Sequence, residues 1–257
     1  MSDAFSIYEP RESGLHRLHP LTKIVLTLCL LTLGLTLPGM WTSYILFGGV
    51  VIPLATWGQV RLKLLKAVWN IVLPFAISVL LIQGFFWGQG TPLFTLGPLT
   101  LKLEGVLFAV TSIGRILLVV SCFTLLALTT RPDTLMFALT QIGLPASLAY
   151  IVAATIQIVP RFRAKASTVI EAQRARGLET EGHMLRRAQA LVPLIMPLVL
   201  GSLVDVEERA IAIEARAFKA KRQKTSLVEL SDSSAQKVLR LSLIVATVLV
   251  AGVGLWL

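Results

Sequence analysis

Long apolar runs dominate the pattern of the chain. No charged residue occurs from Ile24 to Trp57, and Pro38-Gly39, a turn dipeptide, divides this run. A membrane-spanning helix needs about 20 mostly apolar residues, so the run predicts a hairpin of two spans, the first of them short. Three further spans are predicted, which gives five in all: Val68–Trp87, Gly105–Leu128 and Leu241–Leu257.

The predicted connections between spans differ in polarity. Arg61, Lys63 and Lys66 indicate a basic loop before the third span, whereas residues 88–101, after it, are uncharged and rich in Gly, Pro and Thr. Basic connections are retained on the cytoplasmic side of membranes, which predicts an inside N-terminus. No segment of the chain predicts a strand-rich region.

A short amphipathic helix is predicted after the fourth span. Thr130 can cap this helix while Asp133, three residues on, completes a capping-box arrangement with Pro132 in the first turn. The helix is expected to end before the segment Gly143-Leu144-Pro145.

Two shorter apolar runs, 146–159 and 190–204, are ambiguous between membrane and surface. If the first run crossed the membrane, residues 161–187 would lie outside, yet they contain seven Lys or Arg and three acids. The positive-inside rule argues against this arrangement, so we place both runs at the cytoplasmic face. Helices are expected to follow each run, over 162–177 and 205–221.

Composition narrows the class of protein. The chain is 55% hydrophobic and only 15% charged, with a mean hydropathy of +0.77, whereas soluble domains carry about a quarter charged residues. It is therefore expected to be an all-α polytopic membrane protein in contact with the lipid bilayer. Of 24 Lys and Arg residues, 13 lie within 161–224, a local excess typical of a cytoplasmic segment. That segment has only Phe162 and Phe218 as aromatic residues, which disfavours nucleic-acid binding.

These patterns divide the chain into three parts. Residues 1–130 form a leader and the first four spans, residues 131–237 a cytoplasmic helical coupling region, and residues 238–257 the last span. The first twenty residues lack the apolar core of a signal peptide and are expected to remain as a cytoplasmic leader. Cys29 and Cys122 lie inside apolar runs and are expected to be small buried hydrophobic residues.

A motif of alanine, arginine and a small residue occurs twice: Ala175-Arg176-Gly177 and Ala215-Arg216-Ala217. Gly177 stands where a helix favours a left-handed C-terminal cap. A single arginine there would complement the helix dipole. The repetition, with small neighbours that allow close approach, favours docking of both guanidinium groups onto carboxylates of other proteins.

Arg115 is the candidate polar site within the membrane. It lies about 15 Å along the fourth span from Glu104, at a helical rise of about 1.5 Å per residue. A charge at this depth is costly, which makes it a candidate functional residue that faces the bundle interior. A structural bond to a backbone carbonyl is the alternative.

No catalytic site, metal site or cofactor site is predicted from the sequence. His16 and His19 are three residues apart, but no acid or thiol stands at ligand spacing, and His183 is expected to be solvated; no metal site or cofactor is predicted. The motifs G-x-x-x-x-G-K-[ST], G-x-S-x-G and H-E-x-x-H are absent from the sequence. The chain is therefore expected not to be an enzyme.

These motifs together resemble the transmembrane T component of energy-coupling factor (ECF) transporters, a family that includes the cobalt and nickel Q-type subunits. Residues 13–23, SGLHRLHPLTK, are similar to the family pattern S-x-L-H-R-L-D-P-R-x-K, with His19 in place of the aspartate and Leu21 in place of the arginine. Residues 129–133 (TTRPD) and 143–145 (GLP) resemble the family's segment before the coupling region. The likeness extends from about residue 8 to 225.

The resemblance implies a function and a set of partners. Arg176 and Arg216 would each insert into a groove on one of two ATP-binding cassette subunits or domains. Their ATP-driven movement would pass through this chain to a small membrane S component that binds the substrate. The substrate stays open among cobalt, nickel, biotin, a thiamine precursor and other vitamins, and the location implied is the cytoplasmic membrane.

Two other functions compete with this one. Glu171-Ala172 followed by Gly177 is similar to the start of the EAA coupling loop of a conventional ABC permease, although the expected I-x-L-P does not follow at the set distance. A polytopic membrane enzyme that acts on lipid would need polar catalytic groups that the histidines do not supply. A passive scaffold leaves the paired arginines and Arg115 unexplained.

Overall fold

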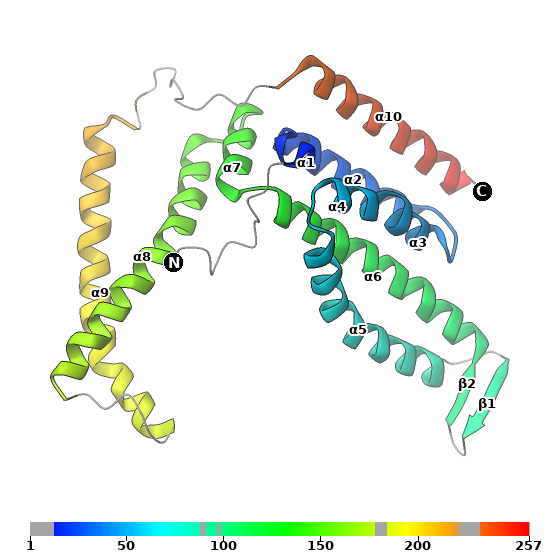
Figure 1. Cartoon of the computed structure of the whole chain (residues 1–257), viewed down its shortest axis with the longest axis horizontal. Coiled ribbons are helices and arrows are strands. Elements are labelled where there is room, and N and C mark those ends of the chain that lie inside the picture. Colours follow the sequence, from blue (N-terminus) through cyan, green and yellow to red (C-terminus); the bar gives the residue numbers. More distant parts are fainter. Residues whose placement is uncertain are drawn as a thin grey trace. The chain divides into compact units, whose positions relative to one another are not determined.

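The chain is helical through nearly all of the part described by the computed structural model, which comprises residues 13–87, 91–96, 99–177, 184–218, 220 and 232–256 (Figure 1). The all-α polytopic fold predicted from the sequence is confirmed. In chain order the elements are α1 (Gly14–Arg17), α2 (Pro20–Thr36), α3 (Thr42–Leu46), the π-helical turn η2 (Phe47–Val51), α4 (Ile52–Trp57), α5 (Arg61–Phe86), β1 (Pro92–Leu96), β2 (Leu99–Lys102), α6 (Leu103–Thr129), α7 (Pro132–Gln141), α8 (Ala146–Ala175), α9 (Met184–Ala215) and α10 (Ser234–Trp256).

The first two predicted spans form a helical hairpin, as expected. Pro20 occupies the start of α2, where its missing N–H costs no helical hydrogen bond. The helix ends at Thr36, and Gly39 turns the chain with a φ of 153°, which L side chains rarely adopt. Helix α3 then begins at Thr42.

A π-helical turn joins α3 to α4. Pro53, near the start of α4, has no N–H to donate to the carbonyl four residues before it. The backbone N–H of Ile52 donates instead to the carbonyl of Phe47, five residues earlier. The wider turn therefore lets the helical path continue past the proline.

The start of the third span differs from the prediction. Helix α5 begins at Arg61, so the basic residues Arg61, Lys63 and Lys66 form its first turns and not a loop. The prediction was wrong because the leucines and lysines of this stretch are good helix formers, and their charge does not end a helix. Leu64 and Val68 on the same helix are buried.

A short β-hairpin interrupts the connection between α5 and α6, where no strand was predicted. Strand β1 pairs antiparallel with β2, with Leu96 opposite Leu99. The carboxylate of Glu104, at the start of α6, accepts hydrogen bonds from the backbone N–H and the hydroxyl of Thr91, at 2.8 and 3.1 Å. Three residues of this connection, 88–90, and the two between the strands lie outside the described part.

Helices α5 and α6 approach each other closely. A Cβ atom at Gly105 of α6 would lie 2.2 Å from the backbone oxygen of Gln83 on α5. Only glycine fits at such a distance, as in other tightly packed membrane helices. The main apolar cluster includes residues of these two helices together with α1, α2, η2 and α4: Leu15, Leu30, Val51, Ala55, Val60, Leu64, Val68, Val72, Leu118, Cys122, Leu125 and Leu128.

Three described helices are long and apolar enough to cross a membrane: α5, α6 and residues Ser234–Gly254 of α10. The apolar stretches Pro20–Thr36 and Thr42–Trp57 are shorter, and they are the hairpin predicted as the first two spans. Helix α10 packs along α2, and only 6% of its apolar window is buried within the chain. Cys29 and Cys122 are free and buried, as predicted.

Helix α7 ends before Gly143-Leu144-Pro145, as predicted, but its N-terminus is built differently. Its N-cap residue is Arg131 and not Thr130, so the predicted capping box is wrong. The Thr134 hydroxyl donates to the carbonyl of Arg131 at 2.8 Å, and the Asp133 carboxylate lies 3.5 Å from the Arg131 guanidinium. At the far end, Gly143 has a left-handed φ of 110°, which ends the helix where expected.

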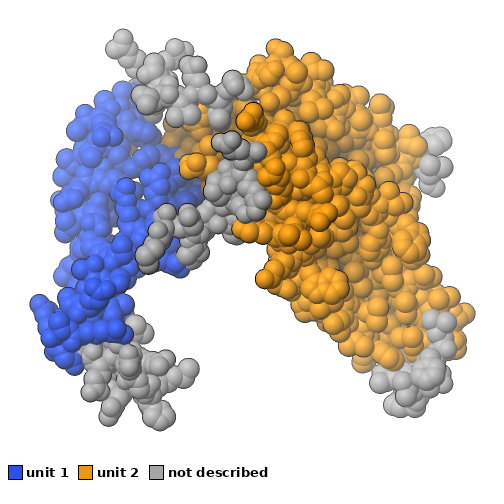
Figure 2. All heavy atoms as spheres, viewed as in Figure 1, with its two compact units in different colours: residues 1–5, 150–229 blue, residues 6–149, 230–257 orange. Residues whose placement is uncertain are grey.

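The two ambiguous apolar runs are parts of long helices. Run 146–159 is the first half of α8, and run 190–204 lies within α9. Helix α9 ends at Ala215, six residues before the expected end at Lys221. The chain forms two compact units, Met1–Phe5 with Tyr150–Glu229 and Ser6–Ala149 with Leu230–Leu257, which are coloured separately in Figure 2. The predicted division at residues 131 and 238 stays a prediction.

Candidate docking ends of helices α8 and α9

The first arginine motif lies at the C-terminal end of α8. Ala175 is the last residue of the helix, and Gly177 has a φ of 89°. The Gly177 N–H donates to the carbonyl of Arg174 at 2.9 Å. This left-handed residue after the helix is the cap predicted from the sequence, and it leaves the Arg176 side chain exposed at the tip.

The second motif ends α9 in the same way. Ala217 has a φ of 52°, and its N–H donates to the carbonyl of Glu214 at 2.9 Å. The Phe218 N–H donates to the carbonyl of Ile213 at 3.2 Å. These two bonds form a Schellman motif, with an alanine where glycine is usual. Arg216 is exposed, like its counterpart.

Arg176 and Arg216 therefore occupy equivalent positions, each one residue before a left-handed residue. Among the described residues, neither guanidinium makes a hydrogen bond or an ion pair. An exposed guanidinium presents five N–H donors in a planar fork that matches a carboxylate. Small residues flank both arginines, Ala175 and Gly177 in the first motif and Ala215 and Ala217 in the second, so these direct neighbours do not shield either guanidinium.

An aromatic contact ties the second motif to the start of α8. The ring of Phe218, next after the motif, packs on the ring of Tyr150, with centroids 5.3 Å apart and planes inclined by 53°. The contact places the end of α9 beside the start of α8, close to Arg216. This pair was not predicted from the sequence, because no local pattern joins residues so far apart.

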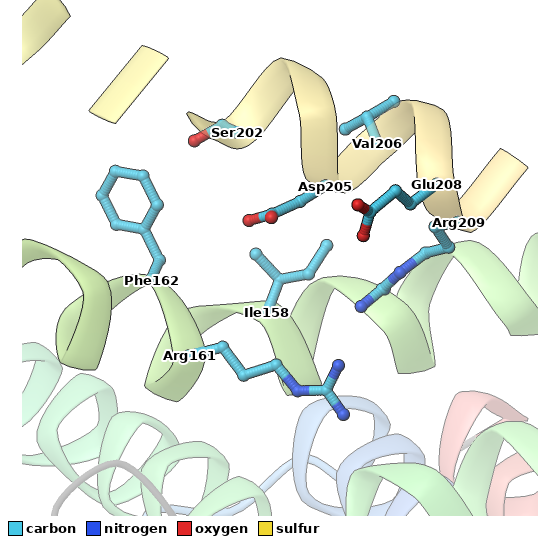
Figure 3. A pocket seen from close by; sticks show the side chains of 8 residues that line it. All are labelled: Ile158, Arg161, Phe162, Ser202, Asp205, Val206, Glu208 and Arg209. Carbon is cyan, nitrogen blue, oxygen red and sulfur yellow. The ribbon is translucent and has the colours of Figure 1, made fainter. Parts of the chain in front are cut away.

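A groove of about 480 Å³ lies between α8 and α9 (Figure 3). The α8 side chains lining it are Ile158, Arg161 and Phe162; those from α9 are Ser202, Asp205, Val206, Glu208 and Arg209. Beside it, the Lys165 ammonium of α8 donates to the Gly201 carbonyl and the Asp205 carboxylate of α9, each at 2.7 Å. These residues were also missed from the sequence.

The leader motif forms a buried junction. The His19 ring caps α2, because its Nδ1 accepts the Leu21 N–H at 3.3 Å. A short acceptor at this position is what an N-cap requires, so histidine here takes the capping role open to an aspartate. The His19 backbone N–H donates to Oε1 of Gln236 on α10 at 2.9 Å. Leu21, the second departure from the family pattern, is buried.

Lys23, also in this motif, is buried and joins α2 to the end of α6. Its ammonium donates to the carbonyl of Thr129 at 2.7 Å and to that of His16 at 3.4 Å. Thr129 is the last residue of α6, where carbonyls lack helical partners and the helix dipole is negative. The motif thus holds three helices together.

Arg115 lies within α6, twelve residues after the helix begins, and its side chain is half-buried. In the described part of the chain no hydrogen bond or ion pair engages its guanidinium, so the alternative of a bond to a backbone carbonyl finds no support there.

The histidines do not form a cluster of ligands in the described residues. Nδ1 of His16 is 2.7 Å from the Ser13 hydroxyl oxygen, and Nδ1 of His19 serves the helix cap. No group of three or more His, Cys, Asp or Glu side chains comes together there. His183 lies outside the described residues.

The long apolar helices are those of a polytopic α-helical membrane protein, which presents one exposed arginine at the end of α8 and another at the end of α9. The family model of the cobalt transport protein CbiQ matches residues 11–227. The chain belongs to this family. The likeness stated from the leader and arginine motifs is thereby confirmed.

Similar proteins agree with this family. The energy-coupling factor transporter transmembrane protein EcfT of Leuconostoc gelidum subsp. gasicomitatum is 30% identical over 264 residues, which cover 97% of this chain and 96% of that protein. The protein of the same name from Listeria innocua serovar 6a is 30% identical over 259 residues, with the same coverage, and that of Brevibacillus brevis is 29% identical over 266 residues, covering 98% and 97%. The chain is a transmembrane component of an energy-coupling factor transporter.

Proposed function

We propose that this chain transmits the ATP-driven movement of two ATP-binding cassette subunits, or fused domains, to a small membrane S component. The observation that carries the proposal is the equivalence of Arg176 and Arg216. Each is an exposed guanidinium one residue before a left-handed helix end. Two equivalent sites on one chain suit two equivalent partners.

Each arginine binds an acidic groove of one ATPase. An arginine and a carboxylate form paired, charge-assisted hydrogen bonds, which fix orientation as well as position. Lysine lacks the planar fork and is not equivalent at such a contact. The arrangement places Ala175, Gly177, Ala215 and Ala217 against the partner surface, where small residues permit close approach.

The chain itself performs no reaction in this scheme. Its sequence contains no G-x-x-x-x-G-K-[ST] phosphate-binding loop, so ATP hydrolysis belongs to the partner subunits. The S component supplies the substrate site, for a vitamin or a transition-metal ion. The complex lies in the cytoplasmic membrane with both arginine motifs on the cytoplasmic side.

Arg115 is proposed as a contact for the S component. A charged guanidinium within a span is costly unless it is paired, and the described chain supplies no pair. A carboxylate or a free backbone carbonyl on a partner helix would satisfy it. We expect Arg115→Met to reduce co-purification of the S component while the ATPases stay bound.

Charge reversal at the two motifs tests the proposal. Arg176→Glu and Arg216→Glu, singly and together, should abolish co-purification with the ATPases while the protein inserts into the membrane at wild-type levels. Arg161→Glu, which reverses another exposed arginine of α8, is the matched control and should retain the ATPases.

The outcomes separate this proposal from the conventional permease. A permease with one coupling loop depends on the first motif alone, so loss of the ATPases in Arg176→Glu but not in Arg216→Glu would favour it. Unchanged co-purification in the double variant would contradict docking through the arginines altogether.

A further inference from the structure

One lysine fastens α8 to α9. The Lys165 ammonium donates to the Gly201 carbonyl and to Oδ2 of Asp205, both at 2.7 Å. The two acceptors lie four residues apart, one turn of α9, so the lysine holds both the backbone and a side chain of that helix. This fixes α8 at one level along α9.

Gly201 makes room for this contact. A Cβ atom at residue 201 would lie 2.7 Å from Cε and 2.8 Å from Nζ of Lys165. Any other residue would therefore push the ammonium away from the carbonyl. The glycine, the lysine and the aspartate act as one junction.

The junction positions α8 relative to α9 but adds little to the free energy of unfolding. The side chains of Lys165 and Asp205 are 33% and 62% exposed, and exposed ion pairs stabilise proteins only slightly. Its importance comes from where it lies relative to the arginine motifs.

The junction is equally far from both motifs along the helices. Lys165 precedes Arg176 by eleven residues, and Asp205 precedes Arg216 by eleven residues. Eleven residues make about three helical turns, so each arginine lies on the same face of its helix as the junction and about 16 Å along it.

The two helices run antiparallel at this junction. Tyr150, near the start of α8, contacts Phe218, beyond the end of α9, whereas Lys165 contacts Gly201, further back along α9. Later residues of α8 therefore contact earlier residues of α9, as in an antiparallel pair. Figure 1 shows α8 and α9 crossing. The two arginines therefore extend in opposite directions from the crossing.

We propose that Lys165 is a positioning residue, which pins the crossing of α8 and α9 midway between the two docking arginines and so sets their separation. Because both arginines lie eleven residues from the junction, rotation of the helices about it moves both arginines by equal amounts. Without the pin the helices can slip along each other, and a slip of one helical turn displaces one arginine by about 5 Å. The role assigned to the separation rests on the proposed docking, but the pin itself does not.

A distance measurement tests the pin in the full chain, reconstituted in lipid nanodiscs. Spin labels are attached at Ala172→Cys and Ala212→Cys, which are exposed and lie one turn before each arginine. Pulsed electron paramagnetic resonance then measures the distance between the two labels. The native cysteines are removed by Cys29→Ala and Cys122→Ala. Lys165→Met and Gly201→Val should widen the distance distribution at least twofold, at unchanged helicity. Lys165→Arg, which keeps a cationic donor, should stay narrower than Lys165→Met.

The matched control is Glu207→Gln, which removes an exposed carboxylate of α9 two residues from Asp205. It should leave the distribution as narrow as in the parent, whereas Asp205→Asn should widen it. A Lys165→Met distribution as narrow as that of the parent would overturn the proposal.

A second measurement addresses the coupling. In the assembled transporter, Lys165→Met should still co-purify with both ATPases, because both arginines are present, but substrate uptake per ATP hydrolysed should fall severalfold. Unchanged uptake per ATP would refute the positioning role in transport. If Arg176→Glu and Arg216→Glu retained the ATPases while Lys165→Met widened the distances, the docking proposal would fail and the pin would stand.

Discussion

Gly177 and Ala217 share one backbone conformation at the ends of two different helices. Their φ angles are 89° and 52°, and each N–H donates to the carbonyl three residues before it at 2.9 Å. Glycine adopts this conformation without cost, whereas an L-residue loses roughly 1–2 kcal/mol. The end of α9 is therefore strained, whereas the end of α8 is not.

Ala217→Gly should relieve this strain. We expect the free energy of unfolding to rise by about 1 kcal/mol, because glycine adopts the left-handed conformation freely. Gly177→Ala should lower it by a similar amount. Thermal unfolding of the purified chain, with hydrogen exchange at the Phe218 amide, measures both. Ala215→Gly, within the helix, is the control and should be destabilising by about 1 kcal/mol; a destabilising Ala217→Gly would contradict the assignment.

Gly105→Ala should disrupt the packing of α5 on α6. The added Cβ would meet the backbone oxygen of Gln83 at 2.2 Å, and backbone cannot move aside as a side chain can. We expect a loss of about 1–3 kcal/mol, the usual cost of overpacking, seen as a lower melting temperature in detergent. Gly48→Ala serves as the comparison, since nothing lies within 4 Å of its Cβ position. Equal effects of the two substitutions would rule out the close approach.

Lys23→Met should loosen the end of α6. It leaves the buried Thr129 carbonyl without the ammonium that lies 2.7 Å away, and an unsatisfied buried acceptor costs about 1–3 kcal/mol. Limited proteolysis or a thermal melt would report the loss. Lys66→Met removes an exposed lysine of α5 and should leave the melting temperature unchanged. If Lys23→Met and Lys66→Met have the same melting temperature, the contact of Lys23 with Thr129 does not stabilise the fold.

Stability should fall on mild acidification because of His19. Burial lowers the pKa of this imidazole. The negative charge of Asp232 raises it, the positive charge of Arg240 lowers it, and a hydrogen bond with Gln141 raises it, but the net shift is downward. Below the ordinary pKa of about 6.5, the unfolded chain binds a proton that the folded chain resists, so unfolding becomes easier. Melting temperatures from pH 8 to pH 5.5 should decline for the parent chain. The decline should be shallower in His19→Asn, which keeps a capping oxygen without titrating; an identical slope would exclude His19 as the cause.

Features carried by neighbouring residues were predicted well. Pro38-Gly39 marks the turn of the first hairpin, and Gly177 ends α8, because turn and cap residues act through their own backbone. The family emerged from short ordered motifs and was confirmed by the match over residues 11–227.

Features that depend on distant contacts were not predicted. Lys165 resembles any other lysine of an exposed helix, and only the fold brings it to Gly201, thirty-six residues later. The predicted cap at Thr130 failed because that residue is buried beside the end of α6, so the next helix begins after Arg131. The strands β1 and β2 pair across residues that composition alone marks as a loop.

The sparse burial of α10 has a consequence for handling this subunit. Apart from its contact along α2, nearly the whole circumference of the helix has to be solvated by acyl chains or by another protein. The stability of the protein in solution therefore depends on the detergent that surrounds α10. A micelle too thin to cover this helix should cause aggregation before the rest of the fold unfolds.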